Sequence, residues 1–410
     1  MVFSNYSLVS VVLLGCSLGE ILFAANESSM EVRIVAWKYH LIGQEEYYRD
    51  LVQAFERAHP GRRIVVELNE WTVAHDRIRD WTSKGQGPDL TIIPDVWLAE
   101  FAPFLERYPA QLPAGFMDEF DHAMLERSRY KSEILGLVWA ASTKALFYRT
   151  DLFRQARLSP PRIWDDLLAD AKKLNRPPQV YGLALPGAPE LDTADDFYLF
   201  LWSNGGEIFD KSGKVALDSP AALEALTFYR DLVLEFHVTE PDILNCNRPC
   251  AEALFAKGKA AMVETGPWAI QTFRSSSAAV PFSVVPLPKR KEQITQLVTD
   301  HLVLLRGSKH KDAALEFIRF AYQPSWRLRW ARLGMVPERM DVGANDYFRS
   351  DPAWRAFTSV LDQARWLPLM RWEPMDRAIR SSLVEVLSGR VQPERALRGL
   401  AAQLSALAAQ

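Results

Sequence analysis

The sequence predicts an α/β protein with two lobes, and three observations lead to this prediction. The chain has 410 residues, 48% of them hydrophobic and 24% charged, which is more than one hydrophobic core usually spans. Short apolar runs with β-branched residues alternate with helical patterns, as in a parallel sheet covered by helices. A second series of such segments follows in the middle of the chain, so a second sheet is expected there.

The first series contains strand candidates at 33–37, 64–68 and 90–93, separated by helical patterns at 46–59 and 74–84. One face of the first helical pattern is apolar and carries Tyr47, Tyr48, Leu51, Val52 and Phe55. Ligands of parallel sheets lie beyond the carboxyl ends of the strands. The expected ligand edge therefore comprises Trp37, Lys38, Tyr39, His40, Asn69, Glu70, Trp71 and Asp95.

The second series begins with a strand candidate at 145–149, followed by helical patterns at 159–174 and 193–206. The next helix is expected to begin with Ser219 as its N-cap and Pro220 in its first turn. A further strand candidate at 301–308 precedes a helical pattern at 311–322. The tail from Met375 is helical, with a break at 388–394.

The N-terminal segment predicts export. An apolar stretch from Leu8 to Ala25 is followed by small and polar residues, which is typical of a secretory signal peptide, here residues 1–25. Two other interpretations remain, lipid attachment at Cys16 and a retained membrane anchor. Export would place the protein in the periplasm.

The cysteines favour a disulfide bond over a metal site. Of the three cysteines, Cys246 and Cys250 remain once the leader is removed, and exported proteins fold in an oxidising compartment. The alternative is two free thiols. No further cysteine or histidine cluster lies nearby to complete a metal site, so no metal is expected.

Composition and motifs exclude several classes of function. The net charge of −3 and the absence of a basic stripe argue against nucleic-acid binding. The sequence has no phosphate-binding glycine loop, nucleophile elbow or zinc-protease motif, so no enzyme activity and no cofactor are expected. Aromatic residues and carboxylates near strand ends suit a sugar, which offers an apolar face and a rim of hydroxyls.

The segment "EALFAKGKAAMVETGPW", residues 252–268, resembles the signature of family 1 extracellular solute-binding proteins of the maltose/maltodextrin-binding type. "LVQAFERAHPGRRIVVE", "GPDL", "WSNGGEIFDKSGKVALDSPAALEAL" and "GSKHKDAALEFIRFA" follow the family's order, so the resemblance covers about 31–405. The chain departs from the family at "QLVTDHLVLL" and "GLVWAAS", both near the expected cleft.

The resemblance implies a two-lobed periplasmic binding protein fold of type II. Each lobe is expected to be a mostly parallel sheet flanked by helices, with a hinge of about three crossing segments between the lobes. The first lobe would comprise 26–142 and 289–336, and the second 143–288 and 337–410. A monomer would capture a sugar between the lobes and deliver it to the membrane permease subunits of an ABC importer.

The resemblance also implies the ligand-binding residues. Trp268 matches the family's stacking tryptophan, and Gly266 and Pro267 are expected to aim it, because glycine permits unusual backbone angles and proline fixes its own φ. The other candidates match positions at strand ends, the crossover or helix starts, namely Tyr39, His40, Asp95, Trp97, Ser142, Asp195, Asp196, Trp372, Glu373 and Asp376.

Each candidate also has a structural interpretation. Trp268 could pack under a loop, and Asp195 and Asp196 could favour the dipole of their helix. Asp89 is expected to be a structural turn or helix-end partner. Two other functions stay open, the same fold binding a polyol, glycerol phosphate or another solute, and a secreted carbohydrate-active enzyme with paired carboxylates.

Overall fold

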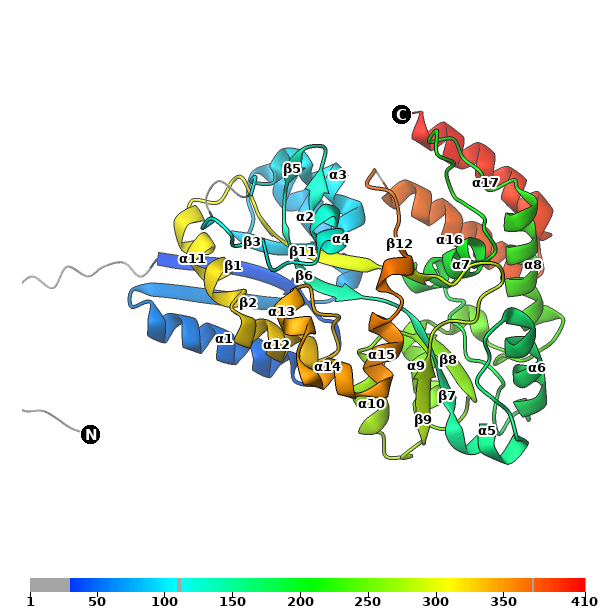
Figure 1. Ribbon diagram of the computed structural model, residues 1–410. Coiled ribbons are helices and arrows are strands. Elements are labelled where there is room, and N and C mark those ends of the chain that lie inside the picture. The colour runs from blue at the N-terminus through cyan, green and yellow to red at the C-terminus, as the bar shows by residue number, and fades with distance from the viewer. Residues whose placement is uncertain (1–29, 109–111, 371, 410) are drawn as a thin grey trace, which may run out of the picture.

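The computed structural model describes residues 30–108, 112–370 and 372–409, and Figure 1 shows them as two lobes side by side. The predicted signal peptide, residues 1–25 with Cys16, lies outside the described residues. We call the elements around the five-stranded sheet the first lobe, and those around the three-stranded sheet the second lobe.

The first pass through the first lobe contains β1 (Met30–Trp37), α1 (Gln44–Ala58), β2 (Arg62–Asn69), α2 (Ala74–Lys84), β3 (Leu90–Pro94), α3 (Leu98–Phe101), α4 (His122–Arg127), β4 (Arg129–Tyr130), β5 (Glu133–Ile134) and β6 (Leu137–Ser142). The chain then builds the second lobe from β7 (Ala145–Arg149), α5 (Thr150–Ala156), α6 (Trp164–Leu174), α7 (Leu191–Ser203), α8 (Pro220–Leu234), α9 (Arg248–Ala256), β8 (Met262–Thr265), α10 (Ala269–Arg274) and β9 (Phe282–Val285).

The chain returns to the first lobe through β10 (Thr295–Gln296), β11 (Val298–Leu304), α11 (Lys311–Ala321) and α12 (Pro324–Arg332). It ends on the second lobe with α13 (Met340–Gly343), α14 (Asp346–Ser350), α15 (Pro352–Thr358), β12 (Ala364–Arg365), α16 (Glu373–Leu387) and α17 (Pro393–Ala408). Among the described residues, none of the helices is long and apolar enough to cross a membrane.

The first-lobe sheet has the order β2-β1-β3-β11-β6. The first three strands run parallel, whereas β11 is antiparallel to both β3 and β6. Only β11 therefore opposes the others within this sheet, as expected for a mostly parallel sheet. In Figure 1, α1 and α12 lie on one side of the sheet, and α2 and α3 lie on the other.

The second-lobe sheet has the order β8-β7-β9, and both strand pairs are antiparallel. The central strand β7 is the one that enters from the first lobe, so β8 and β9 run in the same direction on either side of it. Bridges from Tyr181 to Ala260 and from Ala184 to Val263 add a segment parallel to β8. The mostly parallel sheet expected for this lobe is therefore not found among its three named strands, because the central strand β7 runs against both of its neighbours.

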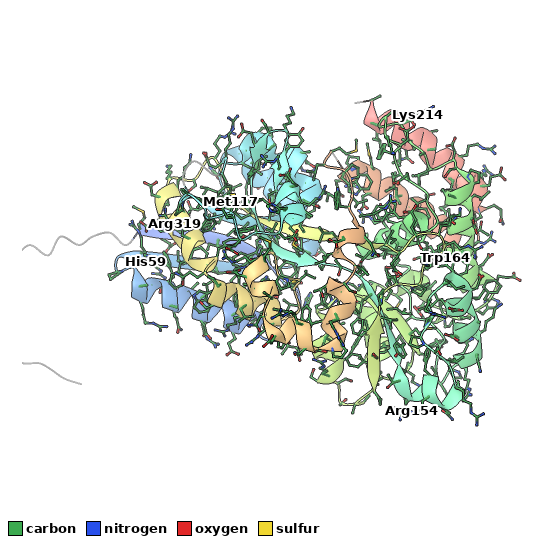
Figure 2. All side chains as sticks on the ribbon, in the orientation of Figure 1. His59, Met117, Arg154, Trp164, Lys214 and Arg319 are labelled. Atoms are coloured by element: carbon green, nitrogen blue, oxygen red, sulfur yellow. A yellow bond between two sulfur atoms is a disulfide. The ribbon has the colours of Figure 1, made fainter. Side chains whose placement is uncertain are left out.

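Separate hydrophobic cores lie in the two lobes. In the first lobe, one face of α1 is buried through Tyr47, Tyr48, Leu51 and Phe55, and Phe55 stacks on His59, whose position Figure 2 labels. In the second lobe, Trp164, which Figure 2 labels, stacks on Phe228 with ring centroids 4.6 Å apart. The predicted N-cap also forms, because the Ser219 side chain accepts a hydrogen bond from the backbone of Ala222.

The hinge region is a set of crossing segments tied by hydrogen bonds. The backbone N–H of Lys144 donates to the hydroxyl of Thr295, which donates in turn to the carbonyl of Lys144, both at 2.9 Å. Gln296 pairs in parallel with Arg365 through β10 and β12. Strand β11 pairs with β6 and follows β10 directly, so these contacts tie together the segments that cross between the lobes.

Candidate functional site

The carboxyl ends of the first-lobe strands gather aromatic rings. Trp37 ends β1 fully buried and donates its indole N–H to the carbonyl of Ile92 at 2.6 Å. Trp71 packs against Trp37 with ring centroids 5.8 Å apart, and Tyr39 packs edge-on against Trp71 at 5.6 Å. Trp37 is therefore a core residue, whereas Tyr39 and Trp71 are partly buried aromatic residues of the predicted ligand edge.

Tyr39 has a partner that sequence reasoning missed. Its hydroxyl donates to Oδ2 of Asp300 on β11 at 2.9 Å. Burial raises the pKa of Asp300 to about 7, the hydrogen bond from Tyr39 lowers it, and the carboxylate of Asp95 raises it further. The departure from the family at "QLVTDHLVLL" was the signal that could have identified Asp300.

Asp95 is part of a buried ion pair and is not an exposed polar residue at the edge of a cleft. Its carboxylate lies 2.6 Å from the guanidinium of Arg127, and both side chains are 5% exposed. Arg127 also donates to the carbonyl of Leu367, a residue of the second-lobe core, so this side chain links the two lobes. The guanidinium lies 5.6 Å from the ring centroid of Trp366, which is 43% exposed.

The remaining first-lobe candidates differ in exposure. Trp97 is 6% exposed and packs against His75 with ring centroids 4.9 Å apart. His40 is exposed, adopts a left-handed φ of 57°, and lies 3.4 Å from Glu70. Glu70 also forms a 2.8 Å ion pair with Lys38, so the charges after β1 and β2 lie in a solvated cluster.

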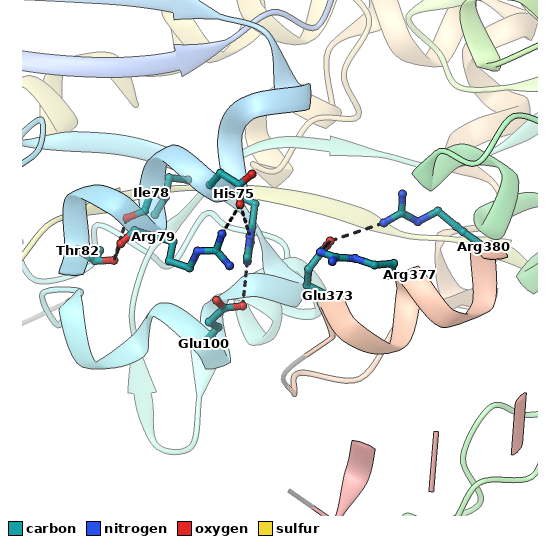
Figure 3. Close-up of polar contacts among 9 residues, drawn as sticks. His75, Ile78, Arg79, Thr82, Glu100, Glu373, Arg377 and Arg380 are labelled. Atoms are coloured by element: carbon teal, nitrogen blue, oxygen red, sulfur yellow. Dashed lines mark hydrogen bonds and ion pairs between the residues drawn. The ribbon is translucent and has the colours of Figure 1, made fainter. Parts of the chain in front are cut away.

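Figure 3 shows polar groups of the two lobes on opposite sides of their boundary. On the first lobe, His75 lies 3.0 Å from the carboxylate of Glu100. On the second lobe, Glu373 at the start of α16 lies 3.1 Å from Arg377 and 3.7 Å from Arg380. The candidate residue Glu373 therefore forms ion pairs with two arginines of its own helix, α16.

The crossover and the start of α7 place the next candidates together. Ser142 ends β6 largely buried and pairs with Val298 of β11. Burial raises the pKa of Glu264 on β8. The buried cation of Lys144, two residues after Ser142, acts in the opposite direction and lowers this pKa. Asp196 forms a hydrogen bond with Glu264 that also lowers its pKa.

Of the two candidate acids on α7, Asp195 is more exposed than Asp196. It accepts a hydrogen bond from the amide of Gln296 at 2.8 Å, whereas Asp196 is 1% exposed. Gln296 belongs to a crossing segment, so this bond joins the second lobe to the hinge.

Trp372 and Asp376 lie in the second-lobe core. Trp372 is 2% exposed and packs against Tyr198 and Phe209. The Tyr198 hydroxyl donates to Asp376 at 3.3 Å, and Arg380 lies 2.7 Å from the same carboxylate. Burial raises the pKa of Asp376 to about 7, the cation of Arg380 opposes this, and nearby acids add to it. On this segment, Trp366 is the accessible aromatic residue, and sequence reasoning did not single it out.

Trp268 lies at the boundary of the lobes. Its half-buried ring packs against hydrophobic clusters of both lobes, and Gly334 beyond α12 approaches its backbone so closely that an added Cβ would lie 2.4 Å from its Cα. Val96, next to Asp95, likewise packs against the clusters of both lobes. The lobes therefore meet at these two side chains.

The turn that carries Trp268 corrects one expectation. Gly266 does not adopt a positive φ, so its role is spatial. An added Cβ there would lie 2.1 Å from the indole, because the ring folds back over the glycine. Glycine is needed here for the close approach of the ring and not for unusual backbone angles.

The structure contains the disulfide bond between Cys246 and Cys250, immediately at the start of α9. Within the described part of the chain, no group of three or more His, Cys, Asp or Glu side chains could hold a metal ion. A cavity of about 20 Å³ in the second lobe, lined by Glu264, Ser203 and apolar side chains, is large enough for a water molecule and far too small for a sugar.

Comparison with known proteins places this arrangement in a family. Residues 42–327 match the family described as bacterial extracellular solute-binding protein. A binding protein of Brucella abortus strain 2308 is 29% identical over 392 residues, covering 94% of this chain and 95% of the relative. The arabinooligosaccharide-binding protein of Bacillus subtilis strain 168 is 24% identical, covering 87% of this chain and 85% of the relative.

Solved structures share the fold along nearly the whole chain. The structure of maltose-bound T. maritima MalE3 has a TM-score of 0.86 and 25% identity, covering 92% of this chain and 100% of that chain. A solute-binding protein of Thermotoga lettingae, bound with α-D-tagatose, has a TM-score of 0.86 and 24% identity, covering 93% and 100%. These relatives are binding proteins. With its family match over 42–327 and its two α/β lobes, the chain belongs to the bacterial extracellular solute-binding protein family.

Proposed function

We propose that the protein is an exported receptor that captures a neutral saccharide between its two lobes and delivers it to the permease subunits of an ABC importer. The observation that carries the proposal is the position of Trp268, a half-buried indole that contacts the cores of both lobes. An aromatic ring at this position offers an apolar platform for a sugar face. Relatives named for binding maltotriose and arabinooligosaccharides support the ligand class.

Polar groups around the lobe boundary would bond the sugar hydroxyls. On the first lobe these are Tyr39 and Asp300, and on the second lobe Asp195 with Gln296. Trp366 is a second exposed ring near the Asp95–Arg127 ion pair and would stack on another sugar unit. The less accessible candidates, which include Trp372, Asp376 and Asp196, are 1–2% exposed, and we do not propose them as direct ligand contacts.

In this proposal the lobes keep the boundaries expected from the sequence, 26–142 with 289–336 and 143–288 with 337–410. Closure about the hinge would trap the ligand and create the face that the permease recognises. Residues 1–25 would direct export to the periplasm, and the receptor would act as a monomer without turnover of its ligand.

A thermal-shift screen tests the ligand class. A ligand that binds only the native state raises the melting temperature, by an amount that grows with its concentration. Maltose, maltotriose, arabinooligosaccharides, free pentoses, polyols and glycerol phosphate form the panel. A shift with a saccharide supports the proposal. A shift confined to glycerol phosphate or a polyol assigns the same fold to another solute.

A further inference from the structure

Glu252 of α9 contacts the candidate ligand tryptophan directly. Its Oε1 atom accepts hydrogen bonds from the indole N–H of Trp268 at 2.6 Å, from Arg248 at 2.9 Å and from the hydroxyl of Thr265. The Glu252 side chain is 13% exposed. Because one oxygen bonds both the indole and the guanidinium, it fixes the two groups relative to each other.

Arg248 lies one helical turn before Glu252, and its guanidinium carbon lies 4.9 Å from the ring centroid of Trp268. The cation thus covers a face of the indole while Glu252 holds its edge. Gly266 lies against the six-membered part of the same ring. Rotation of the indole would have to break these contacts.

The disulfide bond closes the turn that contains Arg248, and Glu252 lies two residues beyond this turn on α9. Arg248 lies between Cys246 and Cys250, and Asn247 caps α9 by accepting a hydrogen bond from the backbone of Cys250 at 3.2 Å. The carbonyl of Cys246 accepts hydrogen bonds from the backbone of Gly187 and Ala188, which lie just before α7. The turn 246–250 therefore touches the approach to α7 as well as the surroundings of Trp268.

We propose that Arg248 and Glu252 are positioning residues for Trp268, held by the disulfide-closed turn 246–250, so that ligand affinity depends on this disulfide. The dependence of affinity rests on the proposed function. The positioning itself does not, because it concerns the orientation of one ring in the protein alone.

Fluorine NMR of the full chain labelled with 5-fluorotryptophan measures that orientation without a ligand. The Trp268 resonance is assigned as the one absent from Trp268→Phe. We expect Glu252→Ala, and reduction of the disulfide with a phosphine, to shift and broaden this resonance. Glu252→Gln keeps an acceptor oxygen for the indole and should stay nearer the parent. Glu394→Ala is the matched control, because it breaks an Arg–Glu pair of the same spacing on α17.

Affinity for the saccharide selected by the thermal-shift screen is then measured for the same proteins. We expect it to weaken about tenfold in Glu252→Ala and after reduction, and to be unchanged in Glu394→Ala. The double variant Cys246→Ser, Cys250→Ser should match the reduced protein. An unperturbed Trp268 resonance in Glu252→Ala and in the reduced protein overturns the proposal. If no saccharide binds the parent, the proposed function fails, and the resonance still decides the positioning.

Discussion

Asp95 and Arg127 lie 2.6 Å apart in an ion pair whose two side chains are each 5% exposed, at the place where the first lobe touches the second. Arg127 extends this contact to the carbonyl of Leu367. The carboxylate therefore neutralises a cation that the protein uses to hold the lobes together. This makes Asp95 as much a structural residue as a residue of the proposed ligand site.

Replacing Asp95 tests that role. Asp95→Asn leaves the Arg127 guanidinium buried without a charged partner, and we expect the free energy of unfolding to fall by about 3–5 kcal/mol. Urea denaturation of both proteins measures the change. Asp76→Asn is the matched control, because its 2.6 Å pair with Arg79 is exposed and contributes less than about 1 kcal/mol. Equal effects of the two variants would refute the structural role of Asp95.

Burial of Asp300 predicts a dependence of stability on pH. Because burial raises its pKa from 3.8 to about 7, the folded state binds this proton more tightly than the unfolded state. The contribution of Asp300 to stability is therefore full below pH 4, falls as the pH rises to 7, and stays low above it. Asp300→Asn removes this pH-dependent contribution to stability, because the amide does not titrate and carries no charge.

The melting temperature of Asp300→Asn, relative to the parent, should rise between pH 5 and pH 8. The corresponding gain in free energy is at most about 4 kcal/mol. Scanning calorimetry at several pH values measures both proteins. A difference that stays constant over this range would show that Asp300 does not titrate there.

Two tryptophans separate ligand contact from packing. Trp268→Ala should weaken saccharide binding by about 2 kcal/mol, roughly thirtyfold, because the ring lies at the lobe boundary. Trp372→Ala should instead cost about 3–5 kcal/mol of stability, because this ring is 2% exposed in the second-lobe core. Calorimetric titration and urea unfolding of both variants measure the two quantities. Unchanged affinity in Trp268→Ala would make this ring a packing residue only.

The disulfide bond between Cys246 and Cys250 can be tested by mass. Protein exported to an oxidising compartment should carry the Cys246–Cys250 bond, which lowers the mass by about two hydrogens. Mass spectrometry without reductant measures this difference on the peptide that contains both residues. Complete alkylation of both thiols in the unreduced protein would contradict it.

Local patterns predicted much of the fold because the signals they use are themselves local. The strand at 145–149 follows from a short run of apolar and aromatic residues, and the N-cap at Ser219 follows from a hydroxyl before Pro220. Strand β6 was not predicted as an element, since its first five residues are all apolar, show no alternation and are buried. A run of this kind gives no periodicity from which its type could be inferred.

The candidate site was less accessible to sequence reasoning, because its partners are far apart in the chain. Asp300 lies 261 positions from Tyr39, and Arg127 lies 32 positions from Asp95. Position along the chain located the ends of the first three strands to within one residue, but it placed the end of β11 four residues too late and could not tell an exposed ring from a buried one. For that reason the sequence placed the core residues Trp37 and Trp372 near the ligand, and it missed the exposed Trp366.

Titration calorimetry with the saccharide selected by the thermal-shift screen, followed by chromatography of the recovered sugar, tests the central claim most directly. We predict saturable heat with one sugar bound per chain, loss of most affinity in Trp268→Ala, and recovery of the sugar chemically unchanged. Release of a shorter sugar or another product during incubation would contradict the account, because a receptor returns its ligand intact.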